Sequence, residues 1–83
     1  MNVRAIFEAL EAAGTNVRYY EPGCLVVAGR AVRFKGNWLH IGRSVQFIRG
    51  PFDILDMLRR NKVITLDSNQ RRIFFQTINN NQQ

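Results

Sequence analysis

The stretch AVRFKGNWLHIGRSVQFIRG, residues 31–50, combines alternating apolar residues with an excess of positive charge. Apolar side chains stand at about every second position, which is typical of β-strands with one buried face. The stretch has four cationic residues and no carboxylate, and no Asp or Glu occurs between Glu21 and Asp53. It therefore predicts strands that carry apolar groups on one face and cations on the other.

Turns that contain glycine divide the chain on both sides of this stretch into short strands. Glycines at 23, 29, 36 and 42 suit tight hairpin links between antiparallel strands. We expect two-residue links at 29–30 and 36–37, and a three-residue link at 42–44. The resulting antiparallel meander has five predicted strands, at residues 16–20, 24–28, 31–35, 38–41 and 45–49.

The register of this meander separates the side chains into two sets, because successive residues of a strand point to opposite faces. One face is expected to be apolar and to pack on the helices; its members are Val17, Tyr19, Leu25, Val27, Val32, Phe34, Leu39, Ile41, Val45 and Phe47. The opposite face is expected to hold Arg18, Tyr20, Cys24, Val26, Arg33, Lys35, Trp38, His40, Gln46 and Ile48.

Two amphipathic segments flank the meander and predict helices. Residues 2–14 place apolar side chains at helical spacing, and Asn2 suits the N-cap of that helix. Residues 51–61 begin with Pro51 and carry acidic residues early and basic residues late, as the helix dipole favours. Both helices are expected to cover the apolar face of the sheet.

The C-terminal part is expected to form a β-hairpin. Residues 63–66 and 73–75 are β-prone, and 67–70 are typical turn residues. Residues 79–83 are polar and predict a disordered tail. The sequence therefore predicts one α+β domain over residues 1–78: a helix, a five-stranded antiparallel sheet, a second helix and a hairpin.

Composition narrows the classes of function. The net charge is +6, from 12 Lys and Arg against 6 Asp and Glu, which favours an anionic partner. The single cysteine forms no internal disulfide, and no apolar run is long enough to span a bilayer, so we expect a cytoplasmic protein. We expect no metal and no cofactor, because one histidine lacks partner ligands and the glycines are spaced as hairpin turns rather than as a phosphate loop.

The basic face of the predicted sheet also carries aromatic residues. Cations neutralise phosphates, and aromatic rings stack on unpaired bases. This combination predicts a small, non-catalytic module that binds RNA or single-stranded DNA. The candidate binding residues are Arg18, Tyr20, Arg33, Lys35, Trp38, His40 and Arg43.

Alternative interpretations of the same face remain open. Residues 62–78 can cover it as a second core, or a homodimer can form through the C-terminal hairpin. The chain can also be an inhibitor or adaptor, of the kind mobile elements encode, that contacts a protein through Arg and Trp, two residue types enriched at binding hot spots.

The order of elements in residues 1–60 resembles that of HicA-type mRNA interferases, and also that of double-stranded-RNA-binding domains. The interferase resemblance implies a ribonuclease with one catalytic histidine on a strand, which is His40 here. The chain departs from the Gly-Ser-His motif of that family, since residues 36–40 are Gly-Asn-Trp-Leu-His. It also lacks a clear counterpart of the basic helix start of the double-stranded-RNA-binding domain.

Overall fold

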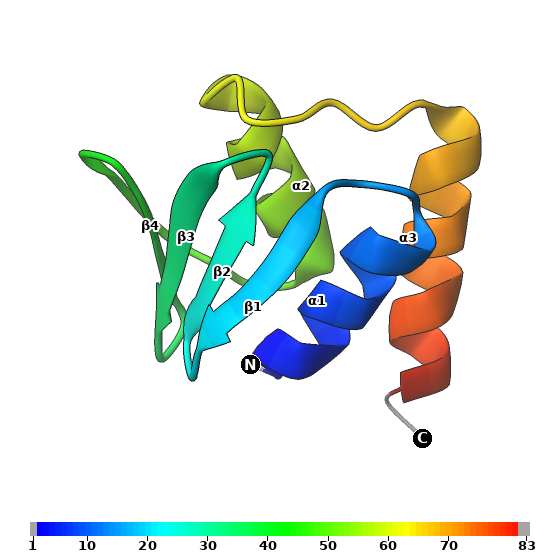
Figure 1. The fold of residues 1–83 in the computed structure, drawn as a ribbon, viewed down its shortest axis with the longest axis horizontal. Helices are drawn as coiled ribbons and strands as arrows, with labels where there is room; N and C mark the ends of the chain where they lie inside the picture. The colour runs from blue at the N-terminus through cyan, green and yellow to red at the C-terminus, as the bar shows by residue number, and fades with distance from the viewer. Residues whose placement is uncertain (1, 82–83) are drawn as a thin grey trace.

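A computed structural model describes residues 2–81 of the chain. It confirms an α+β fold with a five-stranded antiparallel sheet, and the strands follow one another in chain order (Figure 1). The elements are α1 (Val3–Ala12), β1 (Val17–Glu21), β2 (Cys24–Val27), β3 (Arg30–Lys35), β4 (Trp38–Ile41), β5 (Ser44–Phe47), α2 (Pro51–Arg60) and α3 (Ser68–Asn81).

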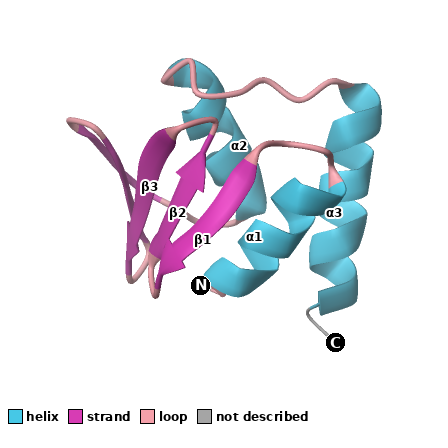
Figure 2. Ribbon diagram, viewed as in Figure 1, coloured by secondary structure: helices cyan, strands magenta, loops and turns pink. Residues whose placement is uncertain are grey.

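The helices lie on one side of the sheet, and α3 packs on α1 at a distance from the strands (Figures 1 and 2). One cluster of buried side chains joins the inner face of the sheet to all three helices. Leu25, Leu39, Leu58 and Phe74 have no exposed surface in this cluster. None of the described elements lies over the opposite face of the sheet, which we call the outer face (Figures 1 and 2).

The inner face of β1 to β4 is built as the alternation predicts. Val17 pairs with Val27, and Phe34 pairs with Leu39. The β2–β3 register differs by two residues, because the turn consists of Ala28 and Gly29, with φ of 50° and 80°, instead of residues 29–30. A shift of two residues changes the cross-strand partners and keeps every side chain on its face.

The expected register of β5 is wrong by one residue. The turn has two residues, Gly42 with φ of 58° and Arg43, so Ser44 already pairs with Ile41. A shift of one residue moves every side chain of a strand to the other face. Val45 and Phe47, expected in the core, therefore lie on the outer face.

Two further side chains exchange faces with them. Gln46 lies half-buried on the inner side, and Ile48, expected on the outer face, is buried in the core. The alternation of apolar residues favours a three-residue turn at residues 42–44, because that turn would place Val45 and Phe47 in the core. In the observed hairpin, Ile48 belongs to the core cluster instead, together with Ile54, Leu55, Met57 and Leu58 of α2.

The expected C-terminal hairpin is also wrong, because residues 68–81 form α3. The segment 67–70 is a helix start rather than a strand turn: the Gln70 amide donates to the Asp67 carboxylate at 2.8 Å, and the Asp67 amide donates to the Gln70 side chain at 3.1 Å. This reciprocal pair is a capping box. Phe74 and Ile78, four residues apart, then face α1 and are buried.

The change from hairpin to helix affects two further expectations. The expected homodimer required a C-terminal hairpin, which the structure does not contain among residues 2–81. Residues 68–78 belong to α3, which packs on α1 on the helix side of the sheet and not over the outer face (Figure 1). Residues 79–81 of the expected disordered tail belong to α3, while residues 82 and 83 lie outside the described part of the chain.

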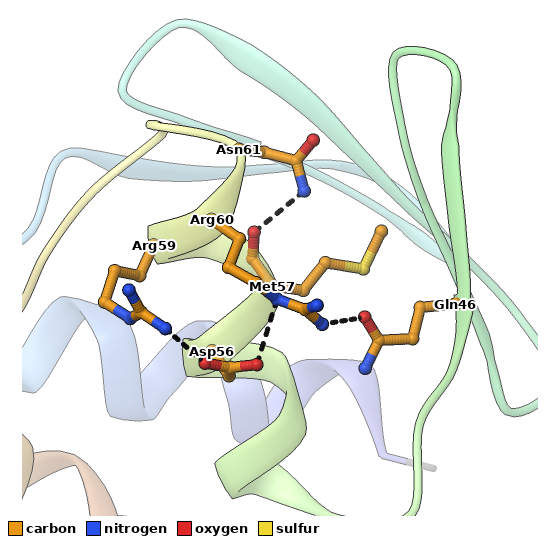
Figure 3. A network of polar contacts seen from close by, with 6 residues as sticks. All are labelled: Gln46, Asp56, Met57, Arg59, Arg60 and Asn61. Carbon is orange, nitrogen blue, oxygen red and sulfur yellow. Dashed lines mark hydrogen bonds and ion pairs between the residues drawn. The ribbon is translucent and has the colours of Figure 1, made fainter.

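A polar network joins α2 to β5 (Figure 3). Asp56 forms ion pairs with Arg59 at 2.7 Å and with Arg60 at 3.0 Å, and Arg60 also donates to the Gln46 side chain. At the end of α2, Ser44 donates to the side chain of Asn61 at 2.7 Å. These contacts hold the edge strand against the last turn of the helix.

The pH dependence of stability is expected to contain a contribution from Asp56. The hydrogen bond from Arg59, aided by the charge of Arg60, lowers the pKa of this carboxyl below its usual value of 3.8. A lowered pKa means that folding favours the carboxylate, so this stabilisation is complete above the unfolded pKa and is lost as the pH falls through the folded one. In thermal denaturation, the difference in Tm between the wild type and Asp56→Asn should narrow below pH 3.8. A difference that stays constant with pH would contradict this assignment.

Candidate functional site

The outer face of the sheet is open to solvent and has two parts of different chemistry. Its aromatic part lies over β4 and β5, where Trp38 and Phe47 are cross-strand partners. Their rings meet edge to face, with centroids 5.4 Å apart and planes at 74°. Trp38 is 49% exposed and Phe47 is 47% exposed, so about half of each side chain is available to a ligand.

Val45 extends the aromatic part along β5. It is 52% exposed and pairs with His40, which is half-buried. Exposed apolar and aromatic side chains that adjoin on one face mark an interaction surface more often than single exposed ones do. Val45, Phe47 and Trp38 together form such a group, which we call the aromatic platform.

The cationic part of the outer face lies over β1 to β3. Arg18 and Lys35 are exposed, and no ion pair is found for either within residues 2–81. Lys35 is the cross-strand partner of Trp38, so a positive charge borders the aromatic platform directly. Arg33 pairs with His40 in the middle of the sheet, and its guanidinium contacts the carboxylate of Glu21 at 3.3 Å.

A bulge at the end of β1 shapes the corner of this face. The register with β2 shifts between Tyr19 and Glu21, which leaves Tyr20 without a cross-strand partner. Tyr20 is 68% exposed, the most exposed of the large hydrophobic side chains among residues 2–81. Glu21 lies beside it and is the one carboxylate placed next to the cationic part.

The register places five of the seven predicted binding residues on this face: Arg18, Arg33, Lys35, Trp38 and His40. Tyr20 lies in the bulge at its corner, where no cross-strand partner assigns it to a face, and Arg43 lies away from it. Arg43 lies in the β4–β5 turn, at the opposite end of the hairpin from Trp38. Cys24 shares the outer side of β2 but is buried, so it behaves as a packed apolar residue. Within the described residues, no three His, Cys, Asp or Glu side chains gather as metal ligands.

Two features of the site are absent from the sequence prediction. Phe47 and Val45 belong to it because β5 is shifted by one residue, and the signal for that shift was the glycine at the first position of the 42–43 turn. The Glu21–Arg33 ion pair depends on the β1 bulge, which no residue pattern indicates. It gives Arg33 a partner inside the protein and leaves Arg18 and Lys35 as the free cations of this face.

The comparisons with known proteins assign no family to this open-faced α+β protein. Neither a family model, nor a curated protein, nor a solved structure matches the chain. None of its helices within residues 2–81 combines the length and hydropathy required to cross a bilayer.

Proposed function

We propose that this protein is a non-catalytic module that binds single-stranded RNA or DNA on the outer face of its sheet. The observation that carries the proposal is the half-exposed Trp38–Phe47 pair, bordered by Lys35, on a face that no described element covers. Bases that are not paired in a duplex stack on such rings, at about 1–3 kcal/mol per base.

The charges favour the same ligand. From residue 22 to 52 the chain has no carboxylate, and four of the six acidic side chains lie in α1 and α2. The backbone of a nucleic acid that stacks on the aromatic platform would pass over Lys35 and toward Arg18. Neutralisation of its phosphates releases counterions, so affinity falls with rising salt concentration.

A single strand fits this face better than a duplex does. The rings of Trp38 and Phe47 lie on a broad sheet surface, where they can contact only bases that are already unstacked. We therefore expect the protein to bind oligouridylate and oligothymidylate more tightly than a duplex of the same length.

The test uses the intrinsic fluorescence of Trp38, the one tryptophan of the chain. Titration with oligouridylate should quench it, and Phe47→Ala should weaken binding by about 5- to 150-fold, the equivalent of one lost stacked base. The matched control is Phe52→Ala, which removes a 59% exposed aromatic side chain from α2 and should leave the affinity unchanged.

The electrostatic contribution to oligonucleotide binding is tested by the salt dependence of the same titration. Lys35→Gln and Arg18→Gln should each lower the slope of log K against log salt by about 0.7, as expected for one phosphate contact with a single strand. Arg72→Gln on α3 serves as the control. The proposal fails if quenching is absent, if the duplex binds equally well, or if the oligonucleotide is cleaved and His40→Gln abolishes the cleavage.

A further inference from the structure

The free edge of β5 carries backbone groups that no described strand pairs with. β5 ends the sheet and has β4 as its one neighbour. The Ile48 amide donates to the Asn37 carbonyl at 2.7 Å, and such bonds alternate along an antiparallel pair. Val45 and Phe47 therefore turn their N–H and C=O groups away from β4, toward the open edge.

A groove accompanies this edge. It has a volume of about 340 Å³ and lies between β5 and the last turn of α2. Gln46, Met57, Arg60 and Asn61, all seen in Figure 3, contribute to its walls together with Ser44 and Val45. An edge strand beside a helix is the arrangement in which extended peptides add to a sheet, because the strand supplies hydrogen bonds and the helix supplies side-chain contacts.

The charges around the groove indicate what enters it. Arg43 and Arg49 flank β5, and neither forms an ion pair within residues 2–81. The groove lining contains no carboxylate, but Arg60 in its wall is already paired with Asp56 at 3.0 Å. The Asp53 carboxylate accepts from the Arg49 backbone amide at 3.0 Å and leaves the Arg49 guanidinium without an ion pair among residues 2–81, so Arg43 and Arg49 are the cations that an occupant would meet. An occupant with acidic side chains at both ends of a short strand would meet a cation at each end.

We propose that β5 binds an extended acidic segment of a partner protein, which adds to the sheet as a further strand. This interaction goes beyond nucleic-acid binding, since it uses the backbone edge of β5 and the groove beside α2 rather than the outer face. The peptide pairs with the N–H and C=O groups of Val45 and Phe47, and its terminal carboxylate side chains contact Arg43 and Arg49.

A second copy of this chain fits the edge less well. Antiparallel pairing of two β5 strands would bring Arg43 of one copy close to Arg49 of the other at both ends of the interface. Like charges placed directly opposite each other across strands are destabilising. The same positive ends favour an acidic strand.

The test uses a terminally blocked heptapeptide of alternating valine and threonine with a glutamate at each end. Titrated into ¹⁵N-labelled protein, it should shift amide resonances of residues 43–49 and of the last turn of α2. Replacement of both glutamates by lysine should weaken binding by about tenfold or more, because the sign of the charge contact is reversed. The double variant Arg43→Gln, Arg49→Gln should weaken binding of the glutamate peptide, and Arg72→Gln should not.

Backbone pairing is tested on the wild-type protein, so the result does not depend on a variant that folds poorly. In the bound peptide, the N–H groups of every second residue face β5. N-methylation of this set of amides should abolish binding, because it removes the donors that pair with β5. N-methylation of the other alternate set should leave binding intact, because those groups face solvent.

Three results would overturn the proposal. The first is equal binding of the glutamate and lysine peptides, or of the two N-methylated peptides. The second is the absence of resonance shifts at residues 43–49 at millimolar peptide. The third is sedimentation as a dimer that Val45→Lys disrupts, since this would assign the edge to a second copy. Oligonucleotide binding by the outer face is measured separately, so failure of one proposal leaves the other testable.

Discussion

Replacement of Phe74 by alanine is expected to lower the free energy of unfolding by about 3–5 kcal/mol, the usual cost of removing a fully buried aromatic ring. Phe74 has no exposed surface and lies in the common core, where α3 packs on α1. A domain of this length has a total stability of roughly 4–12 kcal/mol, so the loss is a large part of the whole. Urea denaturation monitored by circular dichroism measures it.

The matched control for this variant is Phe75→Ala. Phe75 follows Phe74 in sequence but is only partly buried, stacked on the exposed Phe52 at a centroid distance of 6.5 Å. If residues 68–81 are helical, Phe75→Ala should therefore lower the free energy of unfolding clearly less than Phe74→Ala does. On a strand, the two rings would point to opposite faces, and similar losses at both positions would favour the hairpin that the sequence suggested.

Ile48→Ala is expected to cost about 2–5 kcal/mol, because it removes most of a buried side chain and leaves a cavity. Ile48 is 2% exposed and belongs to the core cluster. Phe47→Ala, one residue earlier, should cost about 0.5–1.5 kcal/mol, since it removes an exposed ring and its edge-to-face contact with Trp38.

This pair of variants tests the register of β5. With the three-residue turn that the sequence suggested, Phe47 would be the buried residue and the order of the two losses would be reversed. The same denaturation experiment decides between them. Phe47→Ala must also stay folded for the oligonucleotide titration to be informative, and the small expected loss meets that condition.

Much of the site was predictable because strand alternation is a local property. Arg33, Lys35, Trp38 and His40 lie on the outer face as expected, in a register set by the Gly36 turn. The expected β2–β3 register was wrong by two residues, but a shift of two residues keeps each side chain on the same face of the sheet, so the assignment to the outer face still holds. The one-residue error at β5 changed the site, because it added Phe47 and Val45.

The C-terminal segment shows why a local pattern can be ambiguous. Asp67, Ser68 and Asn69 favour a turn between strands as well as the first turn of a helix. The β-prone Ile73, Phe74 and Phe75 also favour a strand, so the local pattern predicts a hairpin there. The amphipathic α1 decided the outcome, because its far side needs an apolar cover that helical spacing of Phe74 and Ile78 provides.

The sequence alone determined the antiparallel meander, the two flanking helices and the cationic side of β1 to β3, because turn residues and alternation act over a few residues. Tertiary structure decided three features: that residues 68–81 form a helix, that Phe47 lies on the outer face, and that Arg33 forms an ion pair with Glu21. These three depend on which apolar groups fill one shared core volume and on a bulge, and such packing is settled by residues far apart in the chain.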